Sequence, residues 1–153
     1  MNRMSRPFVA LLASLCVLGG AANAAPAPKA RILYLGDSLS IGAFGQTFDA
    51  AMRSAGFQVH TVVAGGASPY YWLRNYQPLP CTIGFWEKSE SSERRVGYVR
   101  AVPKLEDLIS QAKPDVVVVQ TGINLYATLR SKRRPKEESV VEVRSLIDQM
   151  CHS

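Results

Sequence analysis

A serine near the start of the chain follows a short apolar segment in a context that suits nucleophilic chemistry. Leu33–Leu35 is followed directly by Gly36, Asp37 and Ser38. A tight glycine-containing turn after a buried strand presents a hydroxyl at the carboxyl end of that strand, where open α/β sheets bind ligands. The start of the next helix also favours a developing negative charge. Alternatively, Ser38 or Ser40 merely caps that helix, and Asp37 could do the same.

An asparagine follows a second apolar segment, Val116–Val119, in the sequence Thr121-Gly122-Ile123-Asn124. A fixed amide N–H can stabilise the oxyanion of an acyl-transfer reaction, and losing one such donor typically costs about 2.7 to 4 kcal/mol in the barrier. The alternative is that Asn124 only satisfies a turn. If both apolar segments are parallel strands, Ser38 and Asn124 lie at the same edge of one sheet.

The apolar pattern predicts an α/β domain in which strands and helices alternate. The expected strands are Arg31–Leu35, Gln58–Val63 and Asp115–Gln120, and the expected helices are Phe44–Ala55, Lys104–Ala112 and one capped by Ser139. Val116–Val119 is expected to be buried on both faces. Gly36, Gly65 and Gly122 should then lie along one edge of the sheet.

A long aromatic loop is predicted between the second and third strands. Ser68–Ser92 contains Pro69, Pro78 and Pro80 and has no regular period. Tyr70 and Trp72 are candidates for stacking on a substrate, or they anchor the loop by packing on the domain.

The blocks around Ser38 and Asn124 resemble those of the GDSL, or SGNH, hydrolase family. The resemblance implies a three-layer α/β/α sandwich with a parallel, flavodoxin-like sheet whose first strand is central. It also implies that Ser38 is the nucleophile and that the Asn124 side chain donates to the oxyanion. A backbone N–H of Gly66 or Ser68 would complete the oxyanion hole, and Asp37 and Gly122 would border the substrate.

The family's last block, D-x-x-H, has no counterpart in this sequence. The two histidines are His60, within the second expected strand, and His152, which follows Asp148 by four residues rather than three. A serine hydroxyl needs a base to accept its proton, so we expect the chain as written to be nearly inactive. We interpret residues 30–153 as an incomplete domain that lacks its C-terminal part; a degenerate, non-catalytic protein fits the same observation.

Residues 1–24 have the pattern of a secretory signal. Arg3 and Arg6 precede the apolar run Phe8–Leu18, and small residues follow up to Ala24. This order predicts cleavage after residue 24, a short linker over 25–29, and a periplasmic or secreted protein. The run is too short to be a stable membrane anchor, since a spanning helix needs about 20 residues.

Several other classes of function do not fit the sequence. The net charge is +6, or +4 without the predicted signal, and the remaining positive charge is concentrated in Arg94–Arg95 and in 130–136, which form either a solvated loop or a surface that prefers acidic polymers. Aromatic residues are not interleaved with these charges, so nucleic acid is not an expected partner. Cys81 and Cys151 either pair in an oxidising compartment or remain free, and the cysteines and histidines lack the spacing of a metal site. No cofactor is expected.

These observations together predict a serine esterase that hydrolyses acyl esters through an acyl-enzyme on Ser38. The substrate would be a small molecule or a polysaccharide ester, with O-acetylated carbohydrate favoured by the aromatic loop. The alternatives are an acyltransferase that uses the same serine, and a non-catalytic carbohydrate-binding module.

Overall fold

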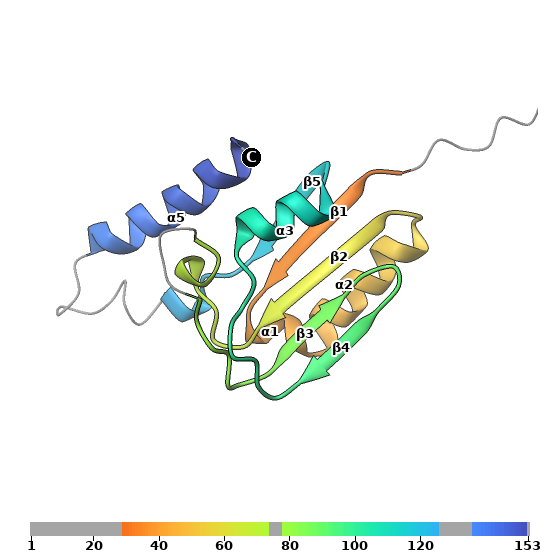
Figure 1. Ribbon diagram of the computed structural model, residues 1–153, viewed down its shortest axis with the longest axis horizontal. Helices are drawn as coiled ribbons and strands as arrows, with labels where there is room; N and C mark the ends of the chain where they lie inside the picture. Colours follow the sequence, from red (N-terminus) through yellow and green to blue (C-terminus); the bar gives the residue numbers. More distant parts are fainter. Residues whose placement is uncertain (1–28, 74–77, 126–135, 153) are drawn as a thin grey trace, which may run out of the picture.

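The computed structural model describes residues 29–73, 78–125 and 136–152 (Figure 1). The predicted signal segment 1–24 lies outside the described residues, as do most of the linker 25–29 and of the basic stretch 130–136.

A five-stranded sheet forms the centre of the described chain, in the order β4-β3-β2-β1-β5. Its strands are β1 (Arg31–Gly36), β2 (Gln58–Ala64), β3 (Phe85–Lys88), β4 (Glu93–Val96) and β5 (Val116–Gln120). β1 pairs in parallel with both β2 and β5, whereas β3 runs antiparallel to β2 and β4. The α/β class and the position of β1 between the other two expected strands are confirmed. The prediction of a wholly parallel sheet is wrong, because the sheet is mixed.

The antiparallel part arises within the segment that was expected to be an aromatic loop. Phe85 and Trp86 occupy successive positions of β3, so their side chains enter the hydrophobic clusters on opposite faces of the sheet. The hairpin turns at Ser89, whose backbone N–H donates to Ser92 O at 2.8 Å. The loop prediction was wrong here because burial of two adjacent aromatic rings, one on each face, stabilises a strand too short to show a clear period.

Helices cover both faces of the sheet and produce three layers (Figure 1). α2 (Ala43–Ser54) packs Phe48 and Met52 against Tyr34 on one face. α3 (Leu105–Ala112) and α5 (Lys136–Cys151) cover the other face. Two further short elements are the single-turn helix α1 (Ser38–Ile41) and the 3-10 turn η1 (Pro69–Tyr71).

Two details of the expected elements need correction. α5 begins at Lys136, so Ser139 lies within the helix and is not its N-cap. Val116 is 46% exposed and the rest of β5 is half-buried, although burial on both faces was expected. The reason is position: β5 is an edge strand of the described sheet, with β1 as its single neighbour. Within the described ranges, no helix is long and apolar enough to cross a membrane.

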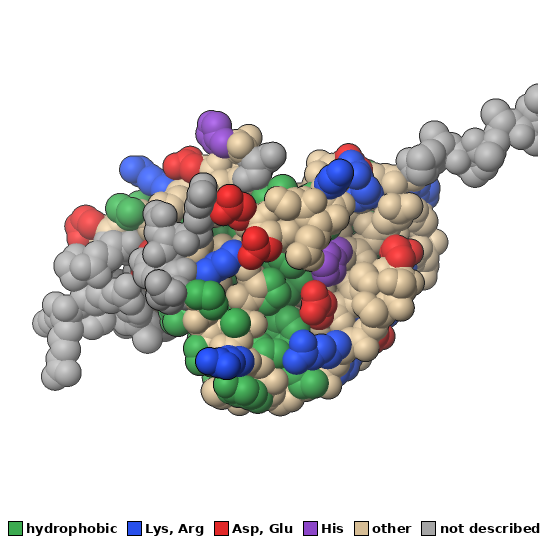
Figure 2. Space-filling model, viewed as in Figure 1, with side chains coloured by type: hydrophobic (Ala, Val, Ile, Leu, Met, Phe, Trp, Pro, Cys, Tyr) green, Lys and Arg blue, Asp and Glu red, His purple; other side chains and the backbone are tan. Residues whose placement is uncertain are grey.

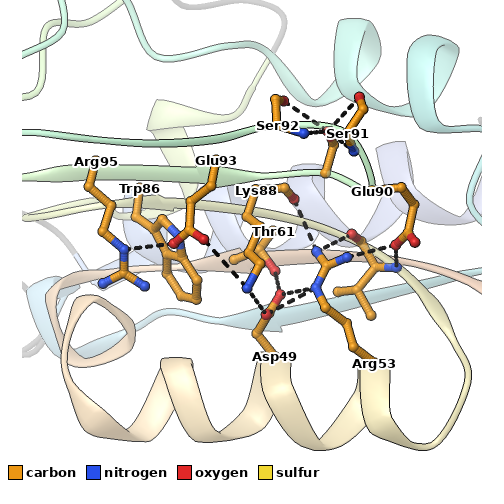
Figure 3. Close-up of polar contacts among 12 residues, drawn as sticks. Asp49, Arg53, Thr61, Trp86, Lys88, Glu90, Ser91, Ser92, Glu93 and Arg95 are labelled. Carbon is orange, nitrogen blue, oxygen red and sulfur yellow. Dashed lines mark hydrogen bonds and ion pairs between the residues drawn. The ribbon is translucent and has the colours of Figure 1, made fainter.

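A buried ion cluster joins α2 to the sheet (Figure 3). Asp49 is 1% exposed and receives hydrogen bonds from Arg53 Nε at 3.0 Å and Thr61 Oγ1 at 2.6 Å. Lys88 Nζ lies 3.2 Å from Asp49 Oδ2, and Arg53 Nη1 lies 2.6 Å from Glu90 Oε1. The cluster thereby holds α2, β2 and the β3–β4 hairpin together.

The environment of Asp49 makes its contribution to stability depend on pH. Burial by itself raises the pKa of the carboxyl group, but the hydrogen bonds from Arg53 and Thr61 outweigh it, so the pKa is lowered. Because the folded-state pKa is depressed, the stabilisation is present above the unfolded value of about 3.9 and is lost as the pH falls through the folded value.

We predict that Asp49→Ala lowers the free energy of unfolding by about 3 to 5 kcal/mol near neutral pH, because it leaves Arg53 and Lys88 without their shared buried partner. The measurement is urea denaturation. Asp115→Ala is the control, since it breaks an ion pair with Arg31 whose side chains are 43% and 48% exposed, and exposed pairs contribute at most about 1 kcal/mol. Equal losses in the two variants would contradict a special role for the buried cluster.

Candidate functional site

The ends of three parallel strands meet at one edge of the sheet. Gly36, the last residue of β1, is in register with Val63 of β2 and with Gln120 of β5. The backbone N–H of Asp37 donates to Gln120 O at 3.1 Å. Gly65 and Gly122 each follow their strand by one or two residues, so the predicted alignment of the three glycines along one edge is confirmed.

Ser38 is the first residue of α1 and its side chain is exposed. Asp37 caps this helix, since its Oδ1 accepts the Leu39 N–H at 3.0 Å. The capping role that sequence left open for Ser38 therefore belongs to Asp37. The Ser38 hydroxyl has no hydrogen-bond partner among the residues that the structure describes, which leaves it available for reaction.

Asp37 was expected to border the substrate, but its position does not allow this. Its side chain is fully buried, because it turns inward to cap α1. The second carboxylate oxygen, Oδ2, has no hydrogen-bond partner in the described part of the chain. Asp37 thus fixes the turn that presents Ser38.

A chain of hydrogen bonds lies under the serine turn. Ser40 is buried and donates through Oγ to Gln120 Oε1 at 2.5 Å. The Tyr34 hydroxyl lies 2.6 Å from Ser40 Oγ. Because the Ser40 hydroxyl has one proton and donates it to Gln120, Tyr34 is the donor in the hydrogen bond between Tyr34 and Ser40. Burial raises the pKa of Tyr34, which keeps its hydroxyl protonated. From the sequence, Ser40 was considered only as a helix cap, because no sequence pattern indicates its hydrogen bonds with Tyr34 and Gln120.

Two glycines allow the backbone to close around Ser40. A Cβ on Gly36 would lie 2.4 Å from Ser40 Cβ, and one on Gly45 would lie 2.0 Å from Ser40 O. Both distances are far shorter than real contacts, so a side chain at Gly36 would force the serine turn away from β1, and one at Gly45 would force it away from α2. Close packing, as well as hydrogen bonding, therefore fixes the position of α1.

Asn124 is joined to the segment that follows β2. Its Nδ2 donates to Ala67 O at 2.7 Å, and Thr121 Oγ1 donates to the same carbonyl at 3.2 Å. An amide nitrogen carries two protons, so one remains for a ligand. The backbone N–H groups of Gly66 and Ser68 take no part in the hydrogen bonds of the described residues. The two expected sources of oxyanion donors are thus brought together at the edge where Ser38 lies.

The other residues expected at the site have structural positions. The Ser68 side chain is buried, and its Oγ has no partner in the part of the chain that is described, so only the backbone of Ser68 can serve as an oxyanion donor. Gly66 has φ +79° and Gly122 has φ +132°, values that glycine adopts readily. Gly122 therefore shapes the turn between β5 and Asn124.

The aromatic loop is an anchor rather than a platform for substrate. Trp72 is fully buried in the cluster that contains Leu105, and its backbone carbonyl accepts the Leu105 N–H at 2.9 Å. The interpretation of Trp72 as a stacking residue is wrong, because its ring fills the core beside α3. Tyr70 is half-buried, with its ring centroid 4.9 Å from that of Tyr71. The argument for a carbohydrate substrate is weakened accordingly.

Neither histidine lies at Ser38. His60 is in register with Leu33, three residues before Gly36 and so about 10 Å back along the strand, and its Nε2 lies 3.4 Å from Glu87 Oε1. His152 bonds through Nδ1 to Asp148 O at 2.8 Å. It follows Met150, which lines a recess with Arg31 at the opposite edge of the sheet. The described residues therefore place neither imidazole beside Ser38.

Cys81 and Cys151 are both free thiols. Cys81 is buried, with its Sγ 3.1 Å from Gly84 O and 3.3 Å from Gly65 O, and Cys151 is exposed. The possible disulfide between them is not formed. Across the described ranges, no group of three or more histidine, cysteine or acidic side chains is placed to hold a metal ion.

Comparison of the chain with protein families, with characterised proteins and with solved structures gave no match. The structure defines an α/β domain with a mixed sheet, in which an exposed serine and an amide donor follow neighbouring parallel strands.

We predict that Ser40→Ala lowers the free energy of unfolding by about 1 to 3 kcal/mol, because it leaves the Tyr34 hydroxyl and the Gln120 amide without their buried partner. Ser38→Ala is the matched control two residues away. It removes an exposed hydroxyl without a partner in the described chain and should change stability by no more than about 0.5 kcal/mol. Urea denaturation of both variants measures the contrast, and similar losses would show that the buried chain does not stabilise the turn.

Proposed function

We propose that this protein is a serine ester hydrolase related to the GDSL hydrolases, with Ser38 as its nucleophile. The observation that carries the proposal is an exposed serine hydroxyl at the carboxyl end of the central parallel strand, beside a second loop that presents an amide donor. The G-D-S and G-x-N sequences at these two positions are the residues on which the relationship rests.

The proposed reaction uses the groups at this edge in a defined order. Ser38 Oγ attacks the carbonyl carbon of an ester and loses its proton to a base. The carbonyl oxygen becomes an oxyanion, which the free Asn124 N–H and a backbone N–H of Gly66 or Ser68 stabilise. Expulsion of the alcohol leaves an acyl-Ser38 ester, and water then hydrolyses that ester to release the acid.

The base is the missing component of the described site. Without an imidazole at Ser38, the proton must pass to water or hydroxide, and removal of a member of a catalytic triad typically costs on the order of 10⁴ in rate. The same observation favours a second candidate, a non-catalytic module that binds an ester-bearing ligand at this edge.

We predict that a serine-reactive phosphonate labels the full chain slowly and at Ser38. The rate should rise steadily with pH between 6 and 9, about tenfold per unit, because hydroxide is the proton acceptor; a histidine base would instead give a plateau above its pKa of about 6.5. Intact mass spectrometry gives the rate, and peptide mapping gives the modified residue.

Three variants test the assignment of the labelled residue and of the oxyanion donor. Ser38→Ala should abolish labelling, whereas Ser110→Ala, which removes an exposed serine on α3, should leave the rate unchanged. Asn124→Ala should slow labelling further, because it removes an oxyanion donor. Labelling that persists in Ser38→Ala would refute the assignment of the nucleophile, and a plateau near neutral pH would show that a base is present.

A further inference from the structure

A recess of about 280 Å³ lies between α1 and the β3–β4 hairpin. It is lined by side chains or backbone of Ile41, Phe85, Trp86, Arg95, Val96 and Gly97. Ile41 is one helical turn after Ser38, and residues three apart on a helix lie on the same side. The recess thus begins next to the proposed nucleophile.

Arg95 is the one charged side chain in the wall of this recess, and it is held in place from two sides. Its guanidinium carbon lies 4.2 Å from the centroid of the Trp86 ring. Its Nε donates to Glu93 Oε1 at 2.9 Å, and the same oxygen accepts Trp86 Nε1 at 3.0 Å. Figure 3 shows the two terminal nitrogens of Arg95 pointing away from Glu93. They make no hydrogen bond within the described residues, so they form a free, pre-positioned fork.

The charge of Arg95 is only partly neutralised by Glu93. The other carboxylate oxygen of Glu93 lies 3.6 Å from Lys88 Nζ, so one anion serves two cations. Figure 2 views the face of the sheet that α3 covers, and it shows basic and hydrophobic side chains next to each other over the region where Figure 1 draws the β3–β4 hairpin. Arg95 stacks on Trp86 and so lies on the opposite face. In the recess, a ligand would meet the apolar side chains of Ile41 and Trp86 together with the charge of Arg95.

We propose that this recess binds a small carboxylate carried on a short aliphatic or aryl group. The planar fork of an arginine matches a carboxylate through two parallel hydrogen bonds, and the apolar floor accepts the hydrocarbon part. The volume equals that of roughly nine water molecules at about 30 Å³ each, which suits a single organic acid group rather than a polymer. The consequence for substrate specificity rests on the proposed function: if Ser38 is the nucleophile, the recess selects esters that bear a carboxylate near the scissile bond.

The exposed neighbours of the recess extend the same surface toward the oxyanion donors. Ile83 is 69% exposed, and a Cβ on Gly65 would lie 3.1 Å from Ile83 Cβ. A Cβ on Gly84 would similarly lie 3.1 Å from Ile41 Cδ1. Apolar side chains therefore connect the Arg95 recess with the loop that carries Gly66.

The test is isothermal titration calorimetry of the full chain with 4-phenylbutyrate and with 4-phenylbutanol, its uncharged analogue. We expect the carboxylate to bind more tightly than the alcohol. Arg95→Gln should weaken binding of the carboxylate about fivefold, the size of effect that an exposed ion pair gives, and should leave the alcohol unchanged. Arg95→Lys should also weaken it, because lysine keeps the charge but lacks the fork.

The matched control is Arg94→Gln, which removes the same charge one residue earlier on β4. Arg94 lies over the Phe85 ring at 5.9 Å, on the other side of the hairpin, so this variant should bind the carboxylate normally. Gly97→Leu tests the recess itself: a Cβ at this glycine meets no atom within 4 Å, so the fold should tolerate the side chain while both ligands lose affinity. Thermal denaturation checks that each variant is folded.

The inference fails if the carboxylate does not bind, if the alcohol binds as tightly, or if Arg94→Gln weakens binding as much as Arg95→Gln. These outcomes are independent of the proposed function, because Ser38→Ala should bind 4-phenylbutyrate normally. Binding of 4-phenylbutyrate without labelling of Ser38 would refute the proposed hydrolase and support the carboxylate site. Labelling of Ser38 without binding of 4-phenylbutyrate would support the hydrolase and refute the carboxylate site.

Discussion

The parallel pairing of β1 with both β2 and β5 is the constraint on which the rest of the structure depends. Because neighbouring parallel strands point the same way, the loops that follow them emerge at one edge, and this pairing brings the Ser38 turn between the loops that begin at Gly65 and Thr121. β1 can occupy this position because its side chains are buried on both faces, with Leu33 and Leu35 in one cluster and Ile32 and Tyr34 in the other.

Strand pairing alone would not fix the position of the turn that carries Ser38. The packing and hydrogen bonds around Ser40 fix that position. The hydroxyl of Ser40 connects a strand, the turn and the neighbouring strand, while the absence of side chains at Gly36 and Gly45 lets the backbone approach it closely. Buried polar groups that are fully satisfied in this way favour one arrangement over its alternatives, because any shift leaves a donor or acceptor unpaired. The same packing explains how Ser38 can be exposed without a partner in the described chain and still be well positioned.

The β3–β4 hairpin extends this architecture in a direction that parallel pairing does not determine. Asp49 and its cationic partners attach the hairpin to α2, and Trp86 inserts beneath the arginine that borders the recess. Glu93 belongs both to the ion cluster around Asp49 and to the contacts that hold Arg95 at the recess, since it contacts Lys88 through one oxygen and Arg95 through the other. Stability of the hairpin and the shape of the recess are thus consequences of one connected set of charges.

The sequence by itself determined the elements whose signals are local. The three parallel strands were predicted to within one residue at each end, because short runs rich in apolar and β-branched residues and bounded by glycine or proline are typical of strands. The positions of Ser38 and Asn124 at one edge followed from those strands. The export signal in residues 1–24 and the hydrolytic activity remain predictions from sequence.

Tertiary structure decided the features that depend on contacts between distant residues. The short strands β3 and β4 are stabilised by the burial of Phe85 and Trp86 on opposite faces, and a four-residue strand carries too little periodicity to be recognised beforehand. Trp72 and Tyr70 look alike in sequence, yet one ring is fully buried and the other half-exposed, because burial depends on where α3 packs. The pairing of Ser40 with Gln120 joins residues 80 apart in the chain, and only the folded sheet brings them into contact.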